Sequence, residues 1–445
     1  MLSITDSVHN IIFVAVLVFN TATNINFIII SFVSERAPFL KCFFSVLVVL
    51  LVVTGTFMNY EMIGKKVSGY IGQYVLNLKR NKSFVNKAYF NSTVNSVHAR
   101  TVTASHGVVL PRNRWFLEEN CEHLMQNTSA KVLKKLILFY NRPQWVSTNS
   151  MYMFGGCSRD MCELTDNRDL MQQADAVVVH VCLISDPHPP PARPPGQVWV
   201  AFGLEPPYYY SGHLDSPAWR GVFNWTLTYR TDSDIFSPYG FLALRSTPPL
   251  KNYTQIALNK TKPVAWFVSN CNTPGRRGQY VQQLQNYIDV DVYGRCGTLK
   301  CPRNKESECL RLLNTTYYFY LSFENSLCRD YVTEKFFKVF NDVNVIPVVR
   351  GGADYEQYFP PNTFINTADF PSPQHLATYL KSLMAETETY ATMLKTKDNF
   401  MLTRNTVPSL CELCKKLHST DIQQRVYPDL MNWTRTDMCR KPADV

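Results

Sequence analysis

The chain has 445 residues, of which 46% are hydrophobic and 18% are charged. This length suits two domains of ordinary size with additional segments, and the composition excludes a largely disordered protein. The formal net charge of +10 fits an anionic ligand or surface, but the basic residues form no long run, which argues against a nucleic-acid-binding protein.

Two apolar stretches open the sequence. The second, residues 39–58, has no charge except Lys41 and is long enough for a membrane span of about 20 residues. We predict that it is an uncleaved transmembrane signal anchor, with residues 1–38 as a cytosolic and apolar segment and a long lumenal body. The first stretch, residues 11–33, is interrupted by polar residues. It is a second span, an interfacial segment or upstream sequence that is not normally used.

Glycosylation sequons support this orientation. Eight N-x-S/T triplets follow the apolar segment and none precedes it, which favours a lumenal body. The candidate glycosylation sites are Asn81, Asn91, Asn127, Asn224, Asn252, Asn259, Asn314 and Asn432.

Cysteine usage points to the same compartment. There are 13 cysteines, and the twelve outside the anchor make an even number, as an oxidising compartment would favour. Cys411 and Cys414 form a C-x-x-C, and Cys157 and Cys162 are another close pair. Structural disulfides are favoured over a four-thiolate zinc site and over a thioredoxin-type motif, because the C-x-x-C does not follow a first strand.

Alternating strands and helices fill the remainder. Residues 59–132 are polar and typical of a stem. Residues 133–258 contain short apolar strands separated by a Pro-rich loop, residues 259–400 alternate strands with helices, and residues 401–445 form a C-terminal tail. This alternation predicts an α/β fold with two doubly wound domains and a cleft between them, where ligands bind beyond the C-terminal ends of the strands.

Two segments of the second domain place bases at predicted helix starts. Arg276 directly follows Gly275, after a predicted strand and at the start of a predicted helix. The free amides of a helix start and the arginines make an anion site there, or the segment is a solvated basic turn. The strand "YYFYLSFE" leads to Asn325, then to Tyr331, whose ring can stack on a base, and to Glu334-Lys335. Lys335 can neutralise phosphate and Glu334 can bind sugar hydroxyls, although both could simply be residues of a solvated first turn. Together these segments suggest a nucleotide-sugar site.

The first domain supplies further carboxylates. Glu205, after the strand "VWVAF" and before two prolines, is a candidate general base for an acceptor hydroxyl. From spacing alone it could equally be an ordinary loop carboxylate. Asp232 and Asp234 form a D-x-D, a spacing that can hold a divalent ion. A structural role, in which they pair with Arg230 or cap the turn, is favoured over metal binding.

Several segments together carry a family resemblance. They are "YYFYLSFENSLCRDYVTEKFF", "VIPVVRGGADYEQYFPPNTFINTADFPSPQHLATYL", "LEPP", "FNWTLTYRTDSDIFSPYG", "VAWFVSNCNTPGRRGQYVQQL", "DVYGRCG" and the terminal C-x-x-C. Over most of residues 134–433 the chain resembles the α1,3-fucosyltransferase family. The stem and anchor resemble type II Golgi enzymes in layout only. One departure is Pro206, where the family usually has Ser.

The resemblance implies a GT-B fold, with two Rossmann-like domains facing across a cleft and GDP-fucose bound by the second. It implies an inverting, single-pass Golgi membrane enzyme that moves L-fucose from GDP-fucose to a GlcNAc hydroxyl of an N-glycan or lactosamine-type acceptor. No cofactor is expected to be required, although Mn²⁺ stimulates some members of the family.

The resemblance also implies roles for individual residues. Lys335 and Arg276 would bind the diphosphate, and Glu334 would contact the fucose or ribose hydroxyls. The remaining implied roles are those of Tyr331 near the guanine, Asn325 near the donor, Glu205 as the general base, and Cys157 and Cys162 as disulfide partners of Cys411 and Cys414. Asp232 and Asp234 receive no role.

Three alternatives are compared with this interpretation. Within the class, the acceptor is either the core GlcNAc of an N-glycan or an outer antenna, and the sequence does not decide between them. Outside it, the chain could be a catalytically inactive type II glycan-binding protein of the same fold. The presence of Glu205, Arg276 and Lys335 argues against that. A disulfide-rich membrane receptor does not explain the acids and bases at strand ends.

Overall fold

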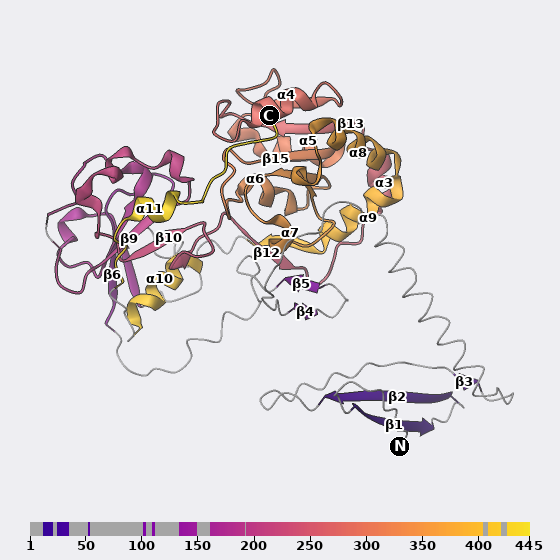
Figure 1. Cartoon of the computed structure of the whole chain (residues 1–445). Helices are drawn as coiled ribbons and strands as arrows, with labels where there is room; N and C mark the ends of the chain where they lie inside the picture. The colour runs from indigo at the N-terminus through magenta and orange to yellow at the C-terminus, as the bar shows by residue number, and fades with distance from the viewer. Residues whose placement is uncertain are drawn as a thin grey trace, which may run out of the picture. The chain divides into compact units, whose positions relative to one another are not determined.

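The structure is a computed structural model that describes residues 133–148, 161–191, 193–403, 408–419 and 425–445, with five short strands nearer the N-terminus (Figure 1). The chain divides into two compact units, residues 1–96 and 97–445. In the first, β1 (Ile12–Asn20) pairs antiparallel with β2 (Ile25–Ser34), which pairs with β3 (Val52–Val53). The apolar stretch at residues 11–33 is thus described as a hairpin.

The predicted anchor at residues 39–58 lies outside the described residues except for β3. Among the described residues, none of the helices has the length and apolar character that crossing a membrane requires. In the second unit, β4 (Thr101–Thr103) pairs antiparallel with β5 (Val109–Pro111), within the segment predicted to be a stem.

The first large sheet has six parallel strands in the order β11-β10-β9-β8-β6-β7. They are β6 (Lys135–Phe139), β7 (Cys162–Thr165), β8 (Ala176–His180), β9 (Val198–Gly203), β10 (Trp225–Thr228) and β11 (Ile235–Phe236). The residues of β8 and β9 are buried without exception, as the continuous apolar runs predict for a parallel sheet covered on both faces.

Two helices from the end of the chain complete this first domain. Helix α10 (Pro408–His418) packs its leucines against one face of the sheet, and α11 (Leu430–Arg435) packs against the other. Helices α10 and α11, which fall in the segment predicted to be a C-terminal disulfide-tied tail, therefore contribute to the core of the first domain.

The second large sheet has five parallel strands in the order β14-β13-β15-β16-β17. The strands are β13 (Lys262–Phe267), β14 (Val290–Tyr293), β15 (Tyr317–Phe323), β16 (Ile346–Arg350) and β17 (Ile365–Asn366). From Phe319 onward, β15 contributes to two different cores, with Phe319, Leu321 and Phe323 in one and Tyr320 in the other, because successive side chains of a strand point to opposite faces. Both faces are therefore covered, and the prediction of two Rossmann-like, doubly wound domains is confirmed.

The helices of the second domain follow the predicted alternation. They are α3 (Tyr253–Leu258), α4 (Arg277–Leu284), α5 (Glu306–Thr316), α6 (Glu334–Phe337), α7 (Tyr355–Tyr358), α8 (Pro373–Ala385) and α9 (Thr387–Asp398). A small antiparallel pair joins β12 (Phe241–Leu244) to β18 (Phe400–Thr403). Short 3-10 helices lie at Arg168–Leu170, Val181–Leu183, Pro207–Tyr209, Gly212–Asp215, Pro217–Trp219, Arg303–Lys305, Lys338–Phe340 and Thr367–Asp369.

Disulfides join distant parts of the described chain. The bonds are Cys162–Cys414, Cys271–Cys296, Cys301–Cys309 and Cys328–Cys439. The predicted bond between the two close pairs is confirmed for Cys162 and Cys414, and Cys411 is also disulfide-bonded, whereas Cys157 lies outside the described residues. Cys182 is a free thiol, so the pairing suggested by an even count does not extend to every cysteine.

Removal of the Cys162–Cys414 bond should destabilise the first domain. The bond closes a separation of 252 residues between β7 and α10. Because such a bond restricts the unfolded chain, we expect Cys162→Ala/Cys414→Ala to lower the free energy of unfolding by about 2–4 kcal/mol, measured by urea unfolding. The matched control is Cys182→Ala, which removes the free thiol. Equal stability of the double variant and the control would show that the bond does not stabilise the fold.

Candidate active site

Polar residues gather beyond the carboxyl ends of β13, β15 and β16 in the second domain. Glu324 and Asn325 follow β15 directly, and Glu334 and Lys335 open α6 after an intervening loop. The amide of Gly275, in the loop after β13, donates to the carbonyl of Asn325 at 2.8 Å, so the two predicted anion-binding segments are adjacent. This edge of a doubly wound sheet is where ligands bind.

The ammonium of Lys335 lies between two carboxylates. Its Nζ is 3.3 Å from Oε2 of Glu324 and 3.1 Å from Oε1 of Glu334, and it donates to Oγ1 of Thr333 at 2.7 Å. Burial alone would lower the pKa of Lys335, but the charges of Glu324 and Glu334 raise it above its ordinary value. Lys335 is therefore a fixed positive charge whose side chain keeps 18% exposure, which leaves it able to meet an anion.

Glu324 is a site residue that the sequence analysis did not identify. Its side chain is fully buried, and it accepts hydrogen bonds from the amide of Thr333 at 2.8 Å and from the hydroxyl of Thr333 at 2.9 and 3.0 Å. Burial raises the pKa of Glu324, against the opposing charge of Lys335. The available signal was an acid placed directly after the buried strand and before Asn325.

Glu334 is the solvent-facing member of this group, with 59% of its side chain exposed. Desolvation acts to raise its pKa, but Lys335 and Lys338 together with its hydrogen bonds bring the pKa below its ordinary value. An exposed, ionised carboxylate beside an ammonium can accept hydrogen bonds from the hydroxyls of a sugar whose phosphate meets Lys335.

The two arginines at α4 have different environments. Arg276 is exposed and adopts a left-handed backbone conformation with φ of 48°, and neither a hydrogen bond nor an ion pair holds its side chain among the described residues. Arg277 is 3% exposed and donates to the carbonyls of Phe323 and Asn270 at 2.7 and 3.1 Å. Arg277 thus holds the two loops together, while the exposure of Arg276 fits either a residue that binds an anion or a solvated basic turn.

Glu205 of the first domain contacts this group directly. It lies two residues beyond β9, and its Oε2 accepts from the hydroxyl of Tyr331 at 3.1 Å and from Nδ2 of Asn325 at 3.5 Å, the long end of the hydrogen-bond range. The hydroxyl of Tyr239 donates to the carbonyl of Leu204 at 2.9 Å and fixes the same loop. Glu205, Asn325 and Tyr331, which the sequence placed in two domains, therefore converge.

The expected stacking of Tyr331 on a base does not fit its position. Tyr331 is 1% exposed, and its ring packs against those of Tyr229 and Tyr239, with centroids 4.9 and 6.1 Å away. Burial is the main cause that raises the pKa of Tyr331 well above its ordinary value, and the nearby charges of Glu324 and Glu205 raise it further. Tyr331 is a neutral donor that orients Glu205, and its ring has no open face for a guanine.

The D-x-D carboxylates are engaged by protein groups. Asp232 pairs with Arg230 at 2.6 Å, as predicted, and also with Arg329 at 2.6 Å. Asp234 accepts from the amide of Thr226 at 2.9 Å and from the hydroxyl of Tyr427 at 2.8 Å. Asp234 therefore stabilises a loop of the first domain, and Asp232 also joins that domain to the loop of Arg329 in the second.

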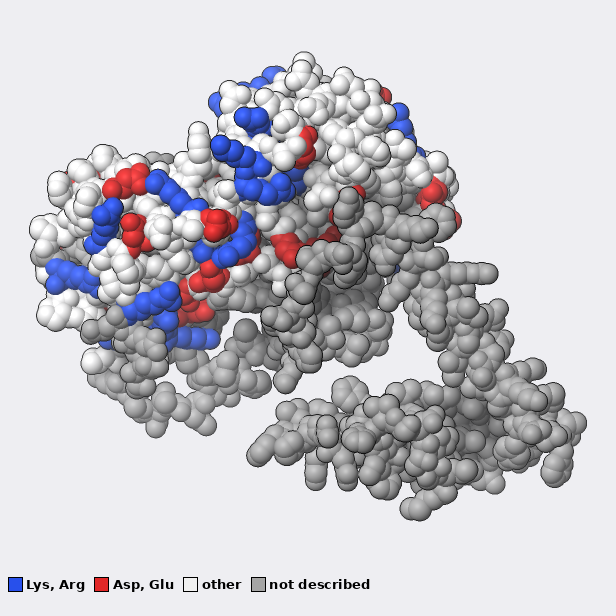
Figure 2. All heavy atoms as spheres, viewed as in Figure 1, with Lys and Arg blue, Asp and Glu red and all other residues white. Residues whose placement is uncertain are grey.

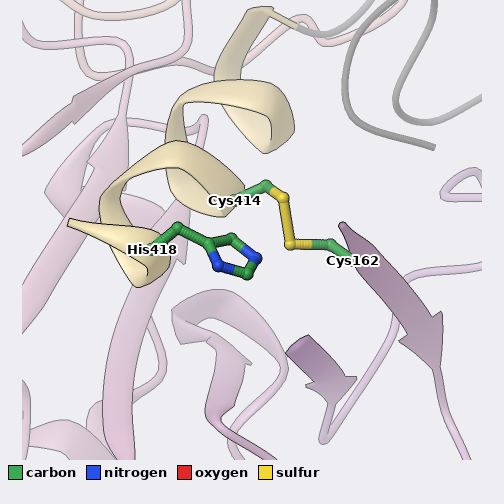
Figure 3. Close-up of side chains that lie close together, drawn as sticks. All are labelled: Cys162, Cys414 and His418. Carbon is green, nitrogen blue, oxygen red and sulfur yellow. A yellow bond between two sulfur atoms is a disulfide. The ribbon is translucent and has the colours of Figure 1, made fainter. Parts of the chain in front are cut away.

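A possible set of metal ligands consists of Cys162, Cys414 and His418 (Figure 3). Their sulfur and ring-nitrogen atoms all lie within 4.8 Å of one another. The two sulfurs are joined in a disulfide, and Nε2 of His418 lies 3.0 Å from the carbonyl of Met161. Zinc binds thiolates, so the oxidised pair does not fit a zinc site.

Asn224 does not suit glycan attachment, in contrast to the expectation from its sequon. Its side chain is buried, with Oδ1 accepting from the amide of Trp199 at 2.9 Å and Nδ2 donating to the carbonyl of Arg425 at 3.1 Å. Asn252, Asn259 and Asn432 are exposed, and Asn314 is half-buried. Asn81, Asn91 and Asn127 lie outside the described residues.

Charges on the face shown in Figure 2 are of mixed sign, with Lys and Arg interspersed among Asp and Glu. On this face the charges of the described residues do not gather into an extended basic surface.

Both domains match known protein families. The model of the family "Glycosyltransferase family 10 (fucosyltransferase) C-term" matches residues 257–433, and that of "Fucosyltransferase, N-terminal" matches residues 133–240. A crystal structure of an alpha1,3-fucosyltransferase with GDP matches 61% of this chain and 84% of its own, at 20% identity and a TM-score of 0.41.

Individual relatives are similar over 62–73% of this chain. Glycoprotein 3-alpha-L-fucosyltransferase A of Drosophila melanogaster is 37% identical over 69% of this chain and 61% of its own length. Alpha-(1,3)-fucosyltransferase C of the same organism is 36% identical, over 62% of this chain and 70% of the relative. A 3-galactosyl-N-acetylglucosaminide 4-alpha-L-fucosyltransferase of Bos taurus is 37% identical, over 73% and 88%. The chain thus spans less than two thirds of the first relative.

Proposed function

The chain belongs to the glycosyltransferase family 10 fucosyltransferases, and on that premise we propose that it transfers L-fucose from GDP-fucose to a GlcNAc hydroxyl with inversion of configuration. The observation that carries the proposal is the contact of Glu205 with Asn325 and Tyr331, which joins a carboxylate of the first domain to the anion-binding edge of the second. A base and a donor site must meet in this way for direct transfer.

The donor side acts through fixed charge. Lys335 and the exposed Arg276 would neutralise the diphosphate, and their charge favours departure of GDP as negative charge develops on it. Glu334, ionised and exposed, would accept hydrogen bonds from fucose or ribose hydroxyls. Buried Glu324 keeps Lys335 charged and in place before the donor arrives.

Glu205 would act as the general base. It would take the proton of the acceptor hydroxyl as that oxygen attacks C1 of fucose and the bond from C1 to the phosphate oxygen of GDP breaks. One direct displacement inverts the anomeric centre, so a β-linked donor yields an α-fucoside. The hydroxyl of Tyr331 holds the Glu205 carboxylate, and Pro206, extended at φ −65° and ψ 159°, restricts the loop.

Catalysis without a metal is part of the proposal. Because the Asp232 and Asp234 carboxylates are engaged by Arg230, Arg329, Thr226 and Tyr427, we expect most fucosyl transfer to survive EDTA. Initial rates with EDTA, and after addition of Mn²⁺, test this. Stimulation by Mn²⁺ is compatible with the proposal, whereas complete loss of transfer that Mn²⁺ alone restores would assign these aspartates to a metal.

The cellular setting proposed is the Golgi lumen, with residues 39–58 as a type II anchor. The disulfides of the described chain support an oxidising compartment, and the exposed sequon asparagines Asn252, Asn259 and Asn432 are accessible to glycosylation. The inactive glycan-binding alternative gains no support, because the chain has all three residues proposed to act in transfer, Glu205, Arg276 and Lys335.

A transfer assay with two acceptors tests the proposal. A secreted protein that begins near Lys134 is incubated with radiolabelled GDP-fucose and either N-acetyllactosamine or a glycopeptide with a free N-glycan core. Label on either acceptor supports fucosyl transfer, and the labelled acceptor identifies the class. Label on neither, with donor still bound, would contradict transfer to GlcNAc of these two types.

A further inference from the structure

Residues 436–445 lie along the candidate donor site. In Figure 1 the yellow segment leaves α11 and ends beside α4 and β15. The Cys328–Cys439 disulfide attaches it to the loop that carries Asn325 and Tyr331. Backbone hydrogen bonds flank the disulfide, from Arg329 to Met438 at 2.7 Å and from Arg440 to Leu327 at 3.0 Å. The segment is thus an ordered part of this edge of the second sheet.

Beyond the disulfide, Asp444 pairs with a buried arginine at the carboxyl end of β16. Nε and Nη2 of Arg350 donate to the two carboxylate oxygens of Asp444 at 2.8 and 2.6 Å. The Arg350 side chain is 2% exposed and that of Asp444 is 34% exposed. A two-pronged pair of this kind fixes the plane and direction of the guanidinium.

The third contact of Arg350 reaches the donor loop. Its Nη1 donates to the carbonyl of Gly275 at 2.6 Å, and its guanidinium lies 5.0 Å from the ring centroid of Tyr280 in α4. The amide of Gly275 donates to the carbonyl of Asn325. Both hydrogen-bonding groups of Gly275 are therefore engaged, one by the loop after β15 and one by Arg350.

The position of Gly275 fixes the position of the backbone of the next residue, the exposed Arg276. A Cβ at Gly275 would lie 3.0 Å from the carbonyl oxygen of Asn325, so the two loops approach closely. Arg276 follows with a φ of 48°, a left-handed conformation that is strained for a non-glycine residue and that persists only when its surroundings hold it. The hold on Gly275 is part of those surroundings.

We propose that Asp444 is a positioning residue for the donor: through Arg350 it fixes the Gly275 carbonyl, and so places Arg276 for the diphosphate of a sugar nucleotide. Nothing about Asp444 requires it to touch the donor. The inference rests on the proposed GDP-fucose transfer. Arg350 and Asp444 are 94 residues apart in the sequence, so no local pattern predicts their contact.

The first test is Asp444→Asn in the full chain, with titration calorimetry of GDP and steady-state kinetics with GDP-fucose. We expect the GDP Kd and the GDP-fucose KM to rise by roughly tenfold or more, with a smaller change in kcat, because the variant misplaces a binding group and leaves Glu205 untouched. A GDP Kd within twofold of wild type would overturn the proposal.

A second variant separates positioning from the cost of an unpaired buried charge. Arg350→Met/Asp444→Asn removes both charges, so no lone guanidinium remains buried, but the Gly275 carbonyl still loses its donor. We expect the GDP Kd to stay raised in this double variant. Recovery of wild-type affinity would show that Asp444 serves only to neutralise Arg350.

The control is Asp215→Asn, which breaks the exposed Arg435–Asp215 pair at the end of α11, directly before this segment. We expect it to bind GDP like wild type, and a matching loss of affinity would overturn the assignment to Asp444. If wild-type protein itself binds neither GDP nor GDP-fucose, the proposed function fails and this inference with it. If wild-type protein binds GDP and the Asp444 variants bind it equally well, the role of Asp444 is contradicted and the proposed function is not.

Discussion

Glu205→Gln should abolish fucosyl transfer and leave GDP-fucose binding intact. The amide keeps the size of the side chain and can still accept from Tyr331 and Asn325, but it cannot take the acceptor proton. The contribution of a general base predicts a loss of kcat of about 10²- to 10⁴-fold. Single-turnover transfer and donor titration measure the two effects separately.

The control for this variant is Glu163→Gln, which neutralises an exposed carboxylate on β7 that pairs with Lys134 at 3.2 Å. It should transfer fucose like wild type. Activity of Glu205→Gln within a few-fold of wild type would place the base elsewhere, and a parallel loss of donor binding would show that Glu205 supports the donor site and not the proton transfer.

Lys335→Ala should raise the KM for GDP-fucose and lower kcat. The variant removes the ammonium that the donor phosphate would meet, and it also leaves the fully buried Glu324 without its charged partner. Loss of one group that stabilises transition-state charge predicts a fall in kcat/KM of about 10²- to 10³-fold. The GDP Kd from calorimetry and the steady-state constants test this.

A second variant is needed because an unpaired Glu324 could disturb the fold. In Lys335→Ala/Glu324→Gln no buried charge is left alone, so its folding should be closer to wild type while GDP binding stays weak. Lys305→Ala, which removes an exposed lysine that pairs with Glu308 at 3.4 Å, is the control. Unchanged GDP affinity in the Lys335 variants would defeat the diphosphate role.

Local patterns predicted the sheets and the donor edge. Apolar runs such as residues 136–139 and Tyr317–Phe323 form strands because a parallel sheet covered on both faces buries most of its residues. Lys335 and Glu334 were predicted because they follow a strand within one loop and open a helix capped by Thr333. The information needed at these positions lies within about 20 residues of sequence, the reach of one β–loop–α unit.

Other features depend on contacts between distant residues. The burial of Tyr331 requires Tyr229 and Tyr239 from far earlier in the chain, and without them its ring appeared free to stack. Asn224 looked like a glycan site until Trp199 and Arg425 engaged its amide. Tertiary packing decides such cases, and sequence spacing carries no signal for it.

The helices after residue 408 illustrate the same limit at the level of domains. Their sequence position suggests a tail, yet α10 and α11 cover the two faces of the first sheet. The only pointer in the sequence was the C-x-x-C, whose Cys414 is bonded to Cys162. A helix packs where its apolar surface matches that of its partner, and the order of residues along the chain does not show which surfaces match.

The anomeric configuration of the product tests the central claim most directly. Wild-type protein is incubated with GDP-β-L-fucose and the acceptor labelled in the two-acceptor assay, and the trisaccharide or glycopeptide is examined by proton NMR. Inverting transfer predicts an α-fucosyl residue on O3 of GlcNAc from the first turnover. A β-fucoside, or free fucose with no fucosylated acceptor, would contradict direct displacement by an acceptor hydroxyl that Glu205 deprotonates.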